Sequence, residues 1–107
     1  MVKLDEFGRF AQPARQVLNV LAAGPRVPVA IRREVGARCG TDLGPGTLFG
    51  TIARLERHAL IEVVAGAAPP RAYRLTALGA ETLEAQVEAL ARTAPAATPA
   101  TNASAAA

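Results

Sequence analysis

Residues 45–64 read PGTLFGTIARLERHALIEVV, and the apolar pattern of this stretch changes once along its length. In its first part, apolar residues recur at i, i+4 and i+7, the spacing of one buried helix face: Leu48, Ile52 and Leu55. Pro45 suits a first helical position, because its missing N–H is not needed there. Residues 60–65 are apolar and partly β-branched, which is typical of a strand. The stretch therefore predicts a helix that ends around His58 and leads directly into a strand.

Upstream of this stretch the pattern predicts two more helices. The first begins near Pro13 and ends at Gly24-Pro25, with Val17, Leu18 and Leu21 as its apolar face. The second opens near Pro28, carries Val29, Ile31 and Val35, and fades at Gly36. Residues 38–46 are rich in glycine and are expected to form a loop.

Downstream, residues 66–70 form a turn signal and residues 71–76 a second strand, so we expect a β-hairpin. Helical spacing returns over residues 78–92. Three helices, a hairpin and a last helix make a mostly α-helical fold with a small β-hairpin, the winged helix-turn-helix arrangement. We divide the chain into a winged helix-turn-helix domain (1–76), a C-terminal helix (77–93) and a tail (94–107).

The two ends of the chain differ from its middle. Leu4, Phe7 and Phe10 could form one apolar stripe of a short helix, and a flexible arm is an equal alternative. Residues 94–107 contain only Ala, Thr, Pro, Ser and Asn, without charge. Such a segment cannot bury enough apolar surface to offset its ordering entropy, so we expect it to be disordered.

Charge is concentrated in the middle of the chain. Eight arginines and four acids lie between Arg26 and Arg74, which leaves +4 there and −1 on the two flanks. A basic centre fits a polyanionic partner, although a solvated surface in an arginine-rich protein would look the same. The aromatic residues are few, so stacking surfaces for single-stranded bases are not expected.

The predicted third helix carries a second row of residues, which we expect opposite its apolar face. Short hydroxyl side chains are followed by longer basic ones, as a helix entering the major groove requires: Thr47, Thr51, Arg54 and His58, with Arg57 beside them. Pro45-Gly46 leaves the first backbone N–H groups open toward a phosphate. The alternative is the ordinary polar face of a surface helix.

The hairpin adds two arginines, Arg71 and Arg74. Arg74 alternates with Tyr73 and Leu75, so it should point away from the core. In a wing, both would lie along the phosphate backbone and add salt-dependent affinity. Two solvated strand arginines are the competing interpretation.

These residues resemble a known family, the PadR-like regulators. The resemblance is carried by Leu43-Gly44-Pro45-Gly46-Thr47-Leu48-Phe49-Gly50, then Arg54-Leu55-Glu56 and Leu60-Ile61-Glu62, and further on by Tyr73-Arg74-Leu75-Thr76 with Gly79. It spans roughly residues 10 to 92. It implies a homodimeric repressor that binds near-palindromic double-stranded DNA operators and is released by a small-molecule effector or another signal.

The resemblance also assigns roles to individual residues. Phe49 joins the DNA-binding set, and the dimer is expected to form through the terminal helices, with these positions at the interface: Leu4, Phe7, Phe10, Leu83, Val87 and Leu90. Packing of Leu83 on the chain's own core is nearly as compatible with the pattern. Phe49 and Val27-Pro28-Val29 replace tyrosine-containing stretches of the family, and the hairpin tip lacks charge.

Other function classes find less support. The chain has one histidine and one cysteine, Cys39, so no disulfide, cysteine metal site or catalytic pair is expected, and His58 fits a surface or capping role. We expect no enzyme activity and no cofactor. No apolar run approaches a membrane span, which predicts a soluble, cytoplasmic protein without a membrane partner. The remaining alternative is a ligand-binding or protein-interaction module that has abandoned DNA.

Overall fold

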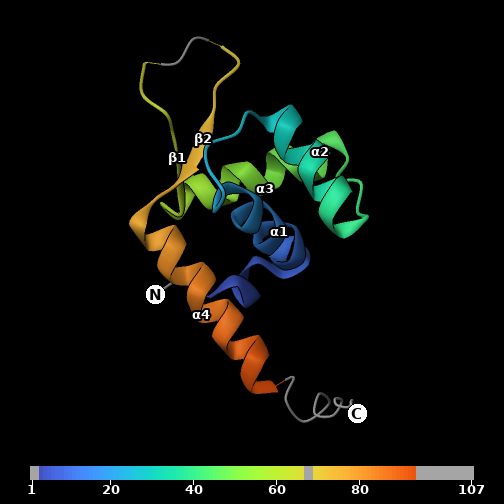
Figure 1. Ribbon diagram of the computed structural model, residues 1–107, viewed down its shortest axis with the longest axis vertical. Coiled ribbons are helices and arrows are strands. Elements are labelled where there is room, and N and C mark those ends of the chain that lie inside the picture. The colour runs from blue at the N-terminus through green and yellow to red at the C-terminus, as the bar shows by residue number, and fades with distance from the viewer. Residues whose placement is uncertain (1–2, 67–68, 94–107) are drawn as a thin grey trace.

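The computed structural model describes residues 3–66 and 69–93, and within 90–93 only the backbone. The predicted tail, 94–107, lies outside the described residues. Along the chain follow a 3-10 helix η1 (Leu4–Phe10), the helices α1 (Ala11–Leu21), α2 (Pro28–Cys39) and α3 (Pro45–Arg57), the strands β1 (Ile61–Val63) and β2 (Tyr73–Leu75), and α4 (Ala77–Thr93). The predicted order and the winged helix-turn-helix fold class are confirmed (Figure 1).

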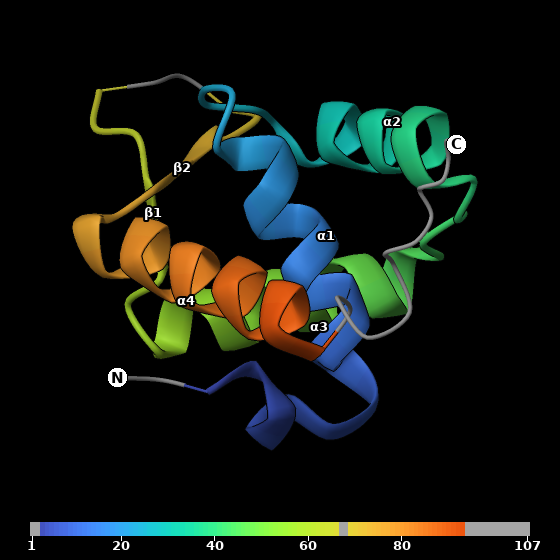
Figure 2. The same cartoon turned by 60° about the horizontal axis from the view of Figure 1, so that its bottom comes forward.

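Helix α1 is the centre of the molecule. Its predicted apolar face, Val17, Leu18 and Leu21, is at most 3% exposed. Helices α2 and α4 lie on opposite sides of α1 in both views (Figures 1 and 2). The buried face of α3, made of Leu48, Ile52 and Leu55, closes the same core.

The short N-terminal segment forms a 3-10 helix, and the flexible-arm alternative does not describe it. The segment kinks at Gly8, whose backbone (φ 60°, ψ −126°) is not helical, so η1 is not one continuous helix. Leu4 and Phe7 precede the kink and Phe10 follows it. All three side chains are buried in the core. Because they are used within the chain, only 2–8% of each residue's surface is left for a partner subunit.

Helix α2 is longer than predicted. The sequence interpretation ended it at Gly36 and began a loop at Arg38, whereas the helix continues to Cys39. Gly40 then takes the left-handed conformation, with φ 68°, and its N–H donates to the Gly36 carbonyl at 3.0 Å. A glycine that caps a helix in this way, rather than a glycine inside it, ends the helix.

The hairpin is antiparallel and shorter than the predicted strands of residues 60–65 and 71–76. Ile61 pairs with Leu75, Glu62 with Arg74 and Val63 with Tyr73. The connection between α1 and α2 lies on the other edge of β2: Arg26 N–H donates to the Tyr73 carbonyl at 3.0 Å, and Tyr73 N–H to the Arg26 carbonyl at 2.8 Å. The wing is thus held on two sides.

Helix α4 starts where the hairpin ends and runs away from the hairpin loop (Figure 1). The Thr76 hydroxyl accepts from Gly79 N–H at 3.0 Å and donates to the Ala59 carbonyl at 2.6 Å. The same residue therefore caps α4 and ties it to the turn after α3. Within the described residues, no helix has the length and apolarity needed to cross a membrane.

Candidate nucleic-acid interface

The start of α2, helix α3 and the hairpin meet on one surface. A hollow of about 410 Å³ is lined from the start of α2, from α3 and from the hairpin, by Val27, Pro28, Val29, Phe49, Pro70, Arg71 and Tyr73. A second hollow of about 180 Å³ lies between α2 and α3, and Phe49 and Val29 line it as well. The helix predicted to read DNA and the predicted wing are therefore neighbours.

The outward row of α3 differs from the row predicted from its polar residues. We use the name outer face of α3 for four exposed residues at i, i+3, i+7 and i+11: Gly46, Phe49, Ala53 and Arg57. Phe49 is 57% exposed. No side chain caps the start of the helix at Gly44, and the first N–H groups of an α-helix have no partner within the helix.

Two residues of the predicted polar row are turned inward. Thr51 is fully buried, and its hydroxyl donates to the Thr47 carbonyl one turn earlier at 2.6 Å. The Arg54 guanidinium lies 3.9 Å from the centre of the Phe10 ring and donates to the Gly50 carbonyl at 3.1 Å. Placing Thr51 on the reading face was wrong, and Arg54 is occupied within the chain in this conformation.

The remaining predicted positions on α3 are accessible. Pro45, Gly46, Thr47 and Arg57 are exposed. His58 is exposed at the end of the helix, where its ring is tilted against Phe7 with 5.1 Å between ring centres.

The two hairpin arginines differ in their surroundings. Arg74 points away from the core, as its alternation predicted, and pairs with Glu62 on the neighbouring strand at 2.8 Å. Arg71 is exposed and lines the larger hollow. Among the exposed arginines of α3 and the hairpin that the structure describes, Arg57 and Arg71 have no ion pair, so both charges are open to an anion.

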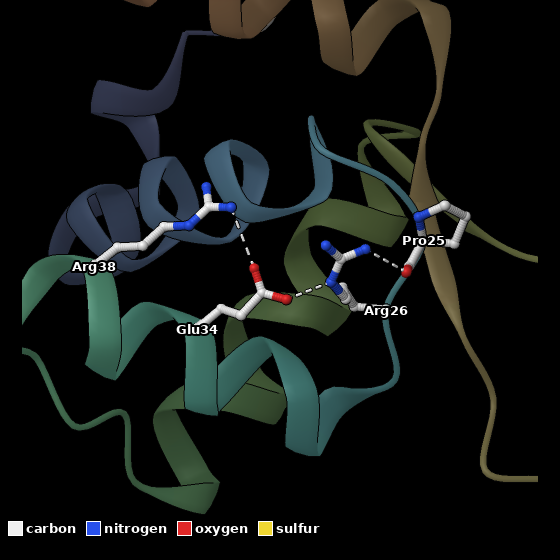
Figure 3. A network of polar contacts seen from close by, with 4 residues as sticks. All are labelled: Pro25, Arg26, Glu34 and Arg38. Atoms are coloured by element: carbon white, nitrogen blue, oxygen red, sulfur yellow. Dashed lines mark hydrogen bonds and ion pairs between the residues drawn. The ribbon is translucent and has the colours of Figure 1, made fainter.

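Several other central arginines are neutralised by acids. The Glu34 carboxylate accepts from Arg26 and, at 3.2 Å, from Arg38, while Arg26 also donates to the Pro25 carbonyl at 2.9 Å (Figure 3). The hydrogen bond from Arg26 lowers the pKa of Glu34, with Arg38 adding to it. Since the Arg26 backbone pairs with β2, this network holds the wing against α2.

A second ion pair spans the α2–α3 connection. The Arg32 guanidinium donates to both Asp42 oxygens, at 2.9 and 3.3 Å. This hydrogen bonding lowers the pKa of Asp42. The pair keeps Asp42 compensated close to the start of α3, where an unpaired carboxylate would repel phosphate.

The predicted dimer residues of α4 fall into three situations. Leu83 packs partly against the core of its own chain. Val87 is 56% exposed, and a shallow groove of about 480 Å³ is lined by Leu83, Glu84, Val87 and Glu88. The side chain of Leu90 lies outside the described part of the structure.

Two site residues could not be recognised from polarity. Val29, at the start of α2, is 61% exposed, and Ala53 lies on the outer face of α3. The helical period could have identified the outward face of α3, because that face lies opposite the buried residues Leu48, Ile52 and Leu55. The polar row lies only about a quarter of a turn from those buried residues. In the described ranges, no group of three or more His, Cys, Asp or Glu side chains is placed to hold a metal.

The fold is similar to that of several proteins of known structure. The chain has the fold of winged-helix transcriptional regulators. H. salinarum RosR superposes with a TM-score of 0.65 at 25% identity, over 74% of this chain and 73% of that one. A transcriptional regulator from Clostridium thermocellum has a TM-score of 0.68 at 21% identity, over 82% and 91%.

Within this class the resemblance to PadR-like proteins is confirmed at the level of the fold. A PadR-like transcription factor from Bacteroides fragilis has a TM-score of 0.68 at 20% identity, covering 88% of this chain and 97% of that one. In sequence, an uncharacterized 37.1 kDa protein in transposon TN4556 of Streptomyces fradiae is 38% identical over 76 residues, 71% of this chain. The chain spans only 22% of that relative's length. No family model matches the chain.

Proposed function

We propose that this chain is a DNA-binding transcriptional regulator of the PadR type that inserts α3 into the major groove of double-stranded DNA. The convergence of the start of α2, the outer face of α3 and the hairpin on one surface carries the proposal. In helix-turn-helix proteins, the N-terminal residues of the recognition helix contact base edges. The similar fold of transcriptional regulators supports the same assignment.

Two arginines are the proposed phosphate contacts. Arg57 and Arg71 are exposed and without an ion pair among the described residues, so neither must break an existing pair to meet DNA. Each phosphate contact lowers the slope of log K against log salt by about one. Arg74, which is paired with Glu62, contributes less in this proposal.

The proposal includes a homodimer and repression. Val87 is exposed on α4 and lines a groove there together with Leu83. A two-fold dimer would place two α3 helices about 34 Å apart, one DNA turn. Repression of a near-palindromic operator and relief by a small-molecule effector rest on the PadR resemblance. Location in the cytoplasm and absence of catalysis belong to the same proposal.

The test is DNA binding with a salt series. A pool of random 30-base-pair duplexes is selected with the protein, and the affinity for the selected duplex is measured from 50 to 300 mM salt. We expect Arg57→Ala and Arg71→Ala each to flatten the salt slope by about one. Arg38→Ala is the charge-matched control, because Arg38 lies on the last turn of α2 and pairs with Glu34. Failure to select any duplex at low salt would favour the protein-interaction module instead.

A further inference from the structure

The centre of the proposed DNA surface is apolar. Phe49 on α3 and Val29 at the start of α2 are 57% and 61% exposed, and both line the same two hollows. Exposed apolar side chains of this size are unfavourable in water and gain stability when a partner buries them. Neither side chain can donate or accept a hydrogen bond.

The charges around this apolar centre favour a polyanion as its occupant. Arg71, which has no ion pair among the described residues, lines the larger hollow, and no acidic residue lines either hollow. Arg57 lies further along the same face of α3. An apolar protein partner would not need this basic rim, whereas the phosphates on both sides of a DNA groove would use it.

The chemistry of the major groove indicates which group of the DNA could contact Phe49. Base edges there present hydrogen-bond donors and acceptors, and a single apolar group, the 5-methyl of thymine. Phe49 is one turn into α3, at the end of the helix that contacts base edges in helix-turn-helix proteins. Its ring lacks the polar atoms needed for the other groups of the groove.

We propose that Phe49 selects thymine in the operator by packing on its 5-methyl group, with Val29 covering the contact from the side of α2. This inference rests on the proposed function, because it requires that α3 enters the groove. It assigns sequence preference to an apolar side chain rather than to the hydroxyl and basic residues of the polar row. Two of those residues, Thr51 and Arg54, are held within the chain.

Removal of the methyl group alone tests the inference. The selected duplex is synthesised with thymine, and then with uracil at one thymine at a time, which leaves hydrogen bonding and phosphates unchanged. We expect at least one position per half-site where uracil weakens binding of the unaltered protein about fourfold, the value of one buried methyl group. Phe49→Ala should bind the thymine and uracil duplexes equally.

The controls separate this inference from the function on which it rests. Arg38→Ala, on the last turn of α2 and outside both hollows, should keep the preference for thymine. Circular dichroism confirms that Phe49→Ala is folded. Equal binding of both duplexes by the unaltered protein overturns the thymine contact and leaves DNA binding intact. A preference that persists in Phe49→Ala overturns the role of Phe49. Failure to bind any selected duplex overturns the proposed function and the inference together.

Discussion

Replacing Gly79 by alanine should destabilise the fold strongly, although it adds only one methyl group. Gly79 lies in the first turn of α4, and a Cβ added there would come within 2.0 Å of the Leu60 carbonyl oxygen and 3.0 Å of its carbon. Both atoms belong to the backbone, so no side chain can rotate away. Gly79→Ala must push α4 and the turn after α3 apart.

The magnitude follows from the contacts at this junction. Overpacking of a tight site costs about 1–3 kcal/mol. Separation also strains the bond from Thr76 N–H to the Leu60 carbonyl, 3.1 Å, and the cap from Gly79 N–H to the Thr76 hydroxyl, each worth about 1 kcal/mol. The better helix propensity of alanine returns about 1 kcal/mol. The free energy of unfolding should therefore fall by roughly 2–4 kcal/mol.

Thermal unfolding followed by circular dichroism is the assay. For a domain of this size, such a loss lowers the Tm by about 10–30 °C. Gly46→Ala is the matched control, because it is also in the first turn of a helix but nothing lies within 4 Å of its added Cβ. Its Tm should stay the same or rise slightly. A Tm of Gly79→Ala within a few degrees of the unaltered protein would refute the close approach of α4 to Leu60.

Three further predictions concern the ion pair, the turn and the dimer. Hydrogen bonding from Arg26 lowers the pKa of Glu34 in the folded state, so the ion pair stabilises the fold fully above the unfolded pKa, about 4.3, and this stabilisation is lost as the pH falls through the folded pKa. In urea unfolding between pH 7 and 3, the free energy of unfolding should therefore fall less for Glu34→Gln than for the unaltered protein. Equal falls would contradict the pair. Ala59 has φ 61°, a conformation that costs a non-glycine residue about 1–2 kcal/mol. After the larger backbone entropy loss of glycine is subtracted, Ala59→Gly should raise the free energy of unfolding by about 0.5–1 kcal/mol. A lower midpoint in urea would contradict this. Val87→Glu should turn the proposed dimer into a monomer in light scattering, and a persisting dimer would move the interface away from this part of α4.

The order and type of the elements were predictable, because each is encoded by a local signal. Leu48, Ile52 and Leu55 repeat at helical spacing and are buried as expected. Pro45 marks the start of α3. The end of α2 was not predictable from its glycines, since Gly36 lies within the helix and only Gly40 takes the left-handed conformation that ends it.

The predicted site was less accurate than the predicted fold. The sequence interpretation took the polar residues of α3 for its outward face, but Thr51 satisfies its hydroxyl on the helix backbone and Arg54 stacks on Phe10. The stacking partner comes from η1, whose inward packing is a tertiary effect that spacing within α3 cannot show. The outward face is made of glycine, phenylalanine and alanine with one arginine, a composition that polarity does not mark as a surface.

The claim that α2, α3 and the hairpin form one DNA-binding surface is tested most directly by NMR. Backbone amide shifts of the 15N-labelled protein are followed while the selected duplex is added. We predict the largest changes at Gly46, Phe49, Arg57 and Arg71, with the start of α2 following and the exposed face of α4 around Val87 unchanged by DNA contact. Changes confined to α4, or none at saturating duplex, would contradict the account.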